Sequence, residues 1–275
     1  MKLIQQSVAD FTQTKFDLIS IYKQIEKCAR ITYKSEDKIT DTSYDKFVHN
    51  LVKLNHDRPL EFGTVHLKMT AYNWNNLIDD LISFGEFNQI WIKAVQDPKY
   101  LDMYITTNYR YYLHIINLGI NVSQYFIDEN NELFPKRHTI KFITNRAIMD
   151  EIRTHVGLSH LAESTRWIDY SKDKFGNELT FVQPTYVDMG LSSDSNSREW
   201  FYDMSFCEDT YKELLKEGWK PQQARDVLPL SIKSELVSCG FEDAWQNFVY
   251  RRSDKAAHPM VRELSNKVNQ LLFNK

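Results

Sequence analysis

The chain has 275 residues, a net charge of −3 at pH 7 and 42% apolar residues. This length and apolar content are enough to fill a substantial core, and we expect a single domain over residues 1–275. The slightly acidic balance excludes a global basic field that would recruit nucleic acid, so any anionic ligand must be held by a local cluster of arginine.

Cysteine usage and hydropathy indicate the compartment. Cys28, Cys207 and Cys239 are odd in number and lack paired spacing, which argues against a disulfide framework and against a zinc site. Residues 1–6 lack an apolar run long enough for a signal peptide, and no apolar stretch of 18 residues occurs. We therefore expect a cytoplasmic protein with no metal, no membrane partner and no nucleic-acid partner.

Apolar spacing predicts the elements of the first half of the chain. Helices are expected over residues 16–29, from Thr42 or Ser43 to Leu54, and over 108–117 and 121–128. Alternation of apolar and polar residues predicts strands over 63–69 and 103–107. Residues 71–102 contain tryptophan and show no clear period.

The second half alternates strands with helices. Strands are predicted over residues 139–144, 178–182 and 231–238, and helices over 145–153, 199–217, 242–252 and 258–273, with a single turn over 221–226. Asn145 suits an N-cap position. Residues 185–197 are rich in Ser, Asp, Asn and Gly and predict a mobile loop. Strands and helices without regular βαβ spacing predict an α+β fold.

The most informative segment runs from Arg153 to Trp167. It combines histidine, small hydroxyl residues, Glu163 and two arginines around a predicted helix-to-loop transition. Free N–H groups beside guanidinium forks suit a phosphate, which favours an anion-binding loop. The alternative on these residues alone is a surface loop whose charges are solvated.

Five blocks of sequence carry the functional argument. They are Ala29-Arg30-Ile31-Thr32-Tyr33, then His56 and Glu61 around Pro59, then Thr144-Asn145-Arg146 with Ser159, Glu163-Ser164-Thr165-Arg166 and residues 170–178, then residues 224–229, and last residues 240–259 with Asn247 and Arg252. Together they resemble the flavin-dependent thymidylate synthases over roughly residues 26–270. One such match is weak, whereas five in the right order are hard to obtain by chance.

The sequence departs from this family at the signature itself. Where the family has Arg-His-Arg, the chain has Thr154-His155-Val156. Ala162 stands at an acidic or amide position of the signature, and Trp167 replaces its usual tyrosine. In the family the two arginines help to hold flavin and nucleotide. Arg153 can substitute for the first of them, and nothing nearby in the sequence replaces the second.

The resemblance implies both a reaction and an architecture. The reaction is the reductive methylation of dUMP at C5 to dTMP, with methylenetetrahydrofolate, FAD and NADPH. The architecture is a central, mostly antiparallel sheet flanked by helices, in which residues 71–138 form a variable, insertion-like region. The family also assembles as a homotetramer with sites at the subunit interfaces.

The resemblance assigns residues to the pyrimidine nucleotide. Arg252 would be catalytic, because a guanidinium near the uracil carbonyl stabilises the negative charge that develops there. Its alternative is a helix-end arginine that satisfies carbonyl groups. The expected substrate contacts are Glu151, Thr154, Glu163, Ser164, Thr165, Arg166 and Arg225. Two alternatives stay open: an ion pair between Arg225 and Asp226, and a pairing of Glu163 with Arg166 in place of a ribose contact.

The resemblance assigns a second group of residues to the flavin. The expected cofactor contacts are Thr32, Arg58, Glu61, His155 and Asn247. A structural histidine is the alternative for His155, and a structural ion pair is the alternative for Glu61.

Two other functions compete with thymidylate synthesis. The signature departures motivate a relative with an altered C5 alkylation or hydroxymethylation of a pyrimidine nucleotide. A non-catalytic nucleotide-binding or nucleic-acid-binding protein is the third possibility, and the acidic pI of about 6.3 counts against nucleic acid as its ligand.

Overall fold

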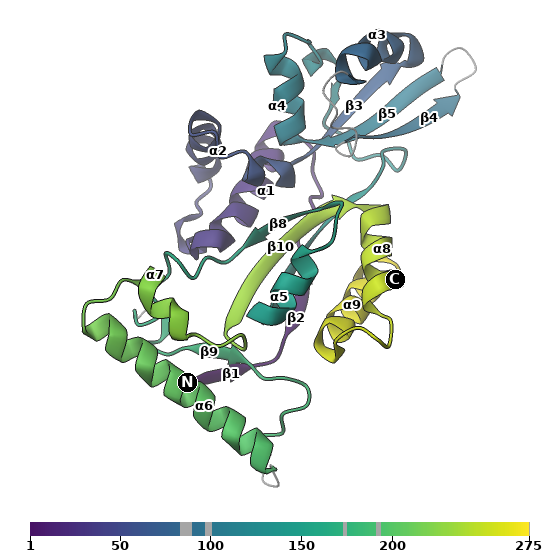
Figure 1. Cartoon of the computed structure of the whole chain (residues 1–275). Coiled ribbons are helices and arrows are strands. Elements are labelled where there is room, and N and C mark those ends of the chain that lie inside the picture. Colours follow the sequence, from purple (N-terminus) through teal and green to yellow (C-terminus); the bar gives the residue numbers. More distant parts are fainter. Residues whose placement is uncertain (83–89, 97–100, 173–174, 191–193, 275) are drawn as a thin grey trace.

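A four-stranded sheet organises the chain, in the order β2-β7-β10-β8 (Figure 1). The computed structural model describes residues 1–82, 90–96, 101–172, 175–190 and 194–274. The strands of this central sheet are β2 (Ser7–Asp10), β7 (Arg137–Asn145), β8 (Leu158–Ala162) and β10 (Lys233–Phe241), and all neighbouring pairs are antiparallel. The α+β class with a mostly antiparallel sheet is confirmed, as are the strands predicted over 139–144 and 231–238.

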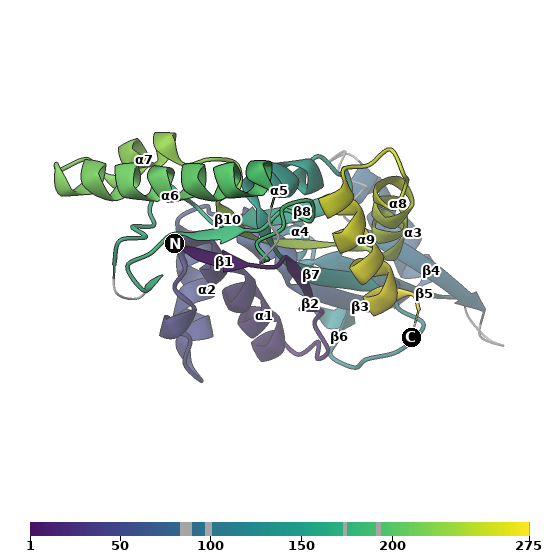
Figure 2. The ribbon, with the colours of Figure 1, turned by 90° about the horizontal axis from the view of Figure 1, so that it is seen from below.

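Helices cover both faces of the central sheet, because β10 is apolar on both. Leu236 packs against a cluster from α5 (Arg146–Arg153), α8 (Glu242–Arg252) and α9 (Pro259–Leu272). Val237 and Cys239 point the other way, against α1 (Leu18–Arg30). Figure 2 shows α5 and α1 on opposite sides of the sheet. The central sheet is therefore buried on both sides, which fixes the starting positions of α5 and α8.

The strand-to-helix transitions begin where the sequence predicts. Asn145 ends β7 and caps α5, since its side-chain oxygen accepts a hydrogen bond from the backbone N–H of Ile148 at 2.9 Å. Phe241 ends β10, and α8 follows directly. The helices predicted over 145–153, 242–252 and 258–273 are confirmed.

The predicted helix-to-loop transition after Arg153 is partly wrong. Residues 158–162 form strand β8, which pairs with β10 from Leu236↔Ala162 to Gly240↔Leu158. Gly157 makes the turn from α5 into β8 with φ of 92°, a left-handed conformation that favours glycine. Only the residues that follow β8 form an irregular loop.

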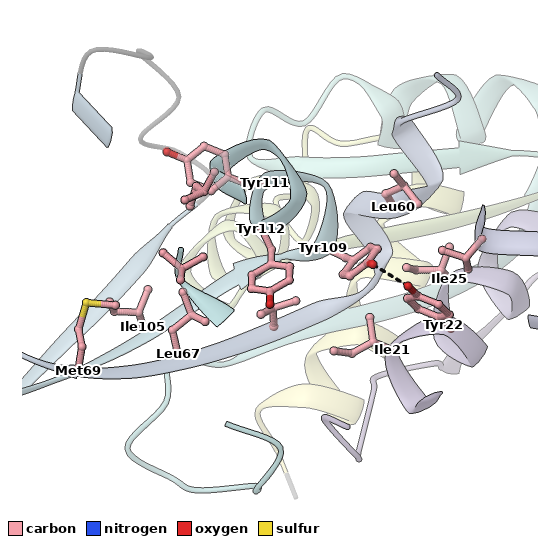
Figure 3. Packing of buried hydrophobic residues seen from close by; sticks show 14 of the residues in the cluster. Ile21, Tyr22, Ile25, Leu60, Leu67, Met69, Ile105, Tyr109, Tyr111 and Tyr112 are labelled. Atoms are coloured by element: carbon pink, nitrogen blue, oxygen red, sulfur yellow. Dashed lines mark hydrogen bonds between the residues drawn. The ribbon is translucent and has the colours of Figure 1, made fainter. Parts of the chain in front are cut away.

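A second sheet, in the order β4-β5-β3-β6, lies beside the central one (Figure 1). Its strands are β3 (Thr64–Thr70), β4 (Trp91–Gln96), β5 (Leu101–Asn108) and β6 (Phe126–Ile127), with α3 (Ala71–Ile82) and α4 (Tyr109–Asn117) packed against them. Figure 3 shows how its core reaches α1: the hydroxyls of Tyr22 and Tyr109 form a 2.7 Å hydrogen bond. This buried contact ties the second sheet to the helix beneath the central one.

The structure corrects two expectations for this second sheet. The segment without clear period, residues 71–102, contains α3, β4 and the start of β5. The helix predicted over 121–128 is wrong, because Ser123–Tyr125 form only a single 3-10 turn before β6. The other predictions of this half hold: helices α1, α2 (Ser43–Lys53) and α4, and strands β3 and β5.

A third group of elements surrounds the short parallel pair β1 (Lys2–Ile4) and β9 (Thr180–Val182). Helix α6 (Ser195–Lys216) packs on this pair with α7 (Pro221–Ala224) and a 3-10 turn over Arg225–Val227. The loop predicted over 185–197 is wrong at its end, where α6 begins after its N-cap Asp194, and residues 191–193 of that loop lie outside the described residues. Within the described ranges, no helix is both long and apolar enough to cross a bilayer.

A buried histidine in the second sheet gives the fold a pH dependence. The His66 ring lies between the rings of Phe16 and Phe134, with centroids at 4.0 and 4.1 Å, and burial lowers its pKa from 6.5 to about 4. Between these values the unfolded chain binds a proton that the folded chain does not, so the free energy of unfolding falls as the pH falls. We expect His66→Phe, which keeps an aromatic ring between the two phenylalanines, to reduce the stability lost between about pH 7 and about pH 5.

Urea unfolding at the two pH values measures this difference. His49→Gln is the matched control, because the His49 side chain is 65% exposed. An equal loss of stability on acidification in His66→Phe and in the unsubstituted chain would contradict the assignment.

Candidate functional site

Arg252, the last residue of α8, is held by the end of α5. Its Nε donates to Nε2 of His155 at 2.7 Å, and its Nη1 donates to the Glu151 carboxylate at 3.2 Å. Its Nη2 donates to the Glu151 carbonyl at 3.0 Å and to the Thr154 hydroxyl at 3.1 Å. The sequence brings these residues together because α5 and α8 both start at the central sheet and run over the same face.

His155 is a neutral acceptor in this arrangement. Burial, followed by the charges of Arg252 and Arg251, lowers the pKa of His155 to about 4. Since Nε2 accepts from Arg252, the single ring proton belongs on Nδ1. The imidazole ring also packs edge-to-face with the Phe248 ring, with the two ring centroids 4.9 Å apart. The imidazole therefore fixes the guanidinium without competing with it for an anion.

An open cavity of about 560 Å³ adjoins this cluster. It is lined by Thr154, His155, Val156, Asn247, Tyr250, Arg251, Arg252 and Asp254. This volume falls in the range of small-molecule sites. Four of the predicted site residues line it, and a fifth, Glu151, holds Arg252 from behind. Sequence reasoning missed Tyr250, Arg251 and Asp254.

The loop after β8 forms a second cluster of predicted site residues. The backbone N–H of Ser164 donates to the Thr32 carbonyl at 2.9 Å, and Arg225 Nη1 approaches the Thr165 hydroxyl at 3.5 Å. The Arg166 guanidinium lies over the exposed Trp167 ring at 5.0 Å. Arg225 and Asp226 are 4.0 Å apart and Asp226 is largely exposed, so their ion pair is weak. This loop keeps hydroxyl and guanidinium groups together.

Neither Arg166 nor Arg225 is among the described residues that line the larger cavity with Arg252. Strand β8 separates the two clusters, and at about 3.3 Å per residue its ends lie about 13 Å apart. Arg252, which the sequence assigns to the same nucleotide as Arg166 and Arg225, therefore lies in a different cluster from them within a single chain.

The structure corrects the role of Glu163. Its side chain is fully buried, and Lys233 donates to its Oε2 at 2.8 Å. Tyr170 donates to its Oε1 at 2.8 Å, and the backbone N–H of Glu235 donates to Oε2 at 3.1 Å. With its carboxylate occupied, Glu163 contacts neither Arg166 nor the surface. It anchors the loop that begins at Ser164.

Two of the remaining flavin candidates, Arg58 and Glu61, line a second, smaller cavity of about 170 Å³. Its lining residues are Arg58, Glu61, Arg137, Gly157, Leu158, Ser159, Cys239, Gly240 and Phe241. Glu61 accepts from Arg110 at 2.7 Å and from the Ser159 hydroxyl, so the ion pair proposed as its alternative role is present. Gly240 is constrained, because a Cβ there would lie 2.8 Å from the Gly157 carbonyl oxygen.

Comparison with known proteins identifies the family to which the chain belongs. The family model of the thymidylate synthase complementing protein, Thy1, matches residues 137–275. Among solved structures, the UMP/dUMP methylase PolB from Streptomyces cacaoi, bound with 5-Br UMP, is similar with a TM-score of 0.46 and 12% identity. That similarity covers 98% of this chain and 90% of the other. No curated protein matches.

The matched half of the chain carries most of the site. It contains the Arg252 clamp (Arg252 with its partners Glu151, Thr154 and His155), the larger cavity and the loop after β8. The matched region begins at the first residue of β7. The chain therefore belongs to the Thy1 family, whose members are described as thymidylate synthase complementing proteins.

Proposed function

We propose that the protein is a flavin-dependent thymidylate synthase, which methylates dUMP at C5 to dTMP with methylenetetrahydrofolate as the carbon donor and NADPH as the reductant. The observation that carries this proposal is the Arg252 guanidinium, which is fixed at the wall of the larger cavity by three neighbouring residues. Membership of the Thy1 family supports it.

Arg252 would act on the uracil ring. C5 becomes nucleophilic when negative charge develops on the ring, part of it on a ring carbonyl oxygen, and a fixed donor stabilises that charge before C5 attacks the one-carbon unit. An arginine carries five N–H donors, and four hydrogen bonds to protein groups leave one of the N–H groups on Nη1 for the ligand. Because the guanidinium is already oriented, little reorganisation is needed as the charge develops.

The residues present fit a flavin. Asn247 accepts from Arg251 through its side-chain oxygen at 3.0 Å, which leaves its amide nitrogen as a donor to the larger cavity. The buried Thr32 hydroxyl has no hydrogen-bond partner within the described part of the chain. We assign FAD to His155 and Asn247, with Thr32, Arg58 and Glu61 as further contacts. Bound FAD, once reduced by NADPH, would supply the hydride that reduces the transferred carbon.

The dUMP phosphate would bind to the loop after β8. Ser164 and Thr165 offer hydroxyl donors, and Arg166 and Arg225 offer paired guanidinium donors. Because β8 separates this loop from Arg252, we propose that one nucleotide contacts Arg252 of one copy and the loop of another, as in the homotetramer that the family resemblance implies.

One observation favours an alternative reaction. Thr154 and Val156 replace the two arginines of the family signature, and Thr154 is occupied by a hydrogen bond from Arg252. A relative with altered chemistry at C5 of a pyrimidine nucleotide would have the same clamp but a different cofactor contact. A non-catalytic nucleotide-binding protein would need neither the flavin nor the clamp.

Incubation of the purified protein with dUMP, methylenetetrahydrofolate, NADPH and FAD tests the proposal. We expect dTMP to form, and flavin absorbance to accompany the purified protein. Omission of FAD after the flavin has been stripped is the control. Flavin absorbance without dTMP would favour the altered C5 chemistry, whereas nucleotide binding without flavin would favour the non-catalytic alternative.

A further inference from the structure

Two adjacent arginines, Arg251 and Arg252, line the larger cavity, but they differ in the number of hydrogen bonds that they make to protein groups. Arg252 makes four hydrogen bonds to residues of α5 and the turn that follows it. Arg251 makes one, from its Nε to the side-chain oxygen of Asn247 at 3.0 Å. Successive residues of a helix point about 100° apart, so one side chain can turn to the protein while the next faces solvent.

Arg251 keeps its charge available to a ligand. Its side chain is exposed, and no carboxylate of the described residues lies within ion-pair distance of it. Asp254 lines the same cavity, but its Oδ1 accepts from the backbone N–H of Ala256 at 2.7 Å. The two Nη groups of Arg251 therefore form the uncommitted cationic end of the cavity.

The cavity also has one exposed apolar and one exposed aromatic side chain, beside the polar Thr154, Asn247 and Asp254. The Tyr250 ring is 82% exposed, and Val156, across from α8 on the turn after α5, is 87% exposed. A flat ring can stack on such an aromatic face, and a guanidinium fork pairs with two phosphate oxygens. The lining thus matches a ligand that joins a ring system to a phosphate ester.

We propose that Arg251 is the phosphate-binding residue of the larger cavity and that the ring system of the same ligand lies against Tyr250 and Val156. This inference deepens the proposed function and rests on it, since FAD is the phosphate ester that it would place there. Arg251 also supplies, from α8, a positive charge at the cavity where Val156 stands in place of the second signature arginine.

Binding of FAD, FMN, riboflavin and dUMP to the flavin-stripped full-length protein tests the proposal. FMN and riboflavin differ only by the phosphate, so their comparison isolates it. We expect Arg251→Gln to weaken FMN and FAD binding by about tenfold or more, as is typical for the loss of a charge-assisted hydrogen bond. Riboflavin binding should change by less than about twofold. Arg251→Lys should lie between the two, since it keeps the charge but loses the fork.

Lys216→Gln is the matched control. Lys216 is also a basic residue in the last turn of a helix, α6, and it is 74% exposed outside the cavity. The Lys216→Gln substitution removes one positive charge at a helix end, as Arg251→Gln does, so any general effect of helix-end charge would appear in both variants. A rescue variant combines Arg251→Gln with Val156→Arg, and we expect it to recover FMN affinity because position 156 borders the same cavity.

Each outcome decides a separate point. Equal weakening of FMN and riboflavin, or no weakening beyond Lys216→Gln, would overturn the role of Arg251 and leave the proposed function standing. If the protein bound no flavin but bound dUMP with the same dependence on Arg251, the phosphate site would hold and the flavin-dependent reaction would fail. Binding of none of the four ligands would overturn both.

Discussion

Arg252→Ala should lower the rate of dTMP formation by about a hundredfold or more while flavin remains bound. The loss is expected because the guanidinium is the donor aimed at the charge that develops on the uracil carbonyl. Arg252→Lys should recover little, since an ammonium group cannot reach His155, Glu151 and Thr154 at once as the planar fork does. Single-turnover rates, with bound flavin followed by absorbance, measure both effects.

Arg262→Ala is the control for Arg252. Arg262 lies on α9 and donates to the Lys255 carbonyl at 3.2 Å, outside the residues that line the larger cavity. The Arg262→Ala variant should form dTMP at nearly the rate of the unsubstituted protein. Survival of turnover in Arg252→Ala within about tenfold would show that another group polarises the ring.

Lys233→Met should cost about 3–5 kcal/mol of unfolding free energy, because it leaves the buried Glu163 carboxylate without its lysine partner. Lys233 pairs with Glu163 at 2.8 Å and with Glu235 at 2.7 Å, and its own side chain is only 14% exposed. Burial alone would raise the pKa of Glu235, but Lys233 and Lys34 bring it to about 2. Urea unfolding at neutral pH measures the loss.

The double variant Lys233→Met/Glu163→Gln separates charge from packing. Removing the carboxylate charge together with the lysine should restore part of the lost stability, because the buried anion that remained is then neutral. If the double variant is as unstable as the sum of the single ones, the interaction between the two side chains is not electrostatic. Weaker dUMP binding in Lys233→Met would follow from displacement of the loop that Glu163 anchors.

The sequence predicted the ends of the main elements where a local signal marked them. Asn145 and Asn108 cap helices that begin where the apolar spacing indicates. Strand β8 was missed because Leu158–Ala162 contain no β-branched residue and lie inside a segment that was interpreted as a loop. The pairing of β8 with β10 comes from contacts distant in sequence, which local propensity does not report.

The site shows the same division between local and distant information. Sequence motifs pointed to Arg252, Thr154 and His155, and the structure brings these three together. They did not show that Glu163 is buried, since that depends on Lys233, 70 residues away along the chain. Arg251 was overlooked because motif comparison directs attention to its neighbour, although a second arginine in the same block was a visible signal.

The bare Cα of Gly240 links the interior of the central sheet to ligand recognition. Any side chain at this position would press on the Gly157 carbonyl, and Gly157 directly follows Thr154, His155 and Val156, three residues that line the larger cavity. A replacement of Gly240 would thus lower activity by displacing the residues that line the larger cavity, although it removes no residue of the site. A loss of activity in a Gly240 variant should therefore be interpreted first as a shift of these cavity residues, and not as evidence that Gly240 takes part in the reaction.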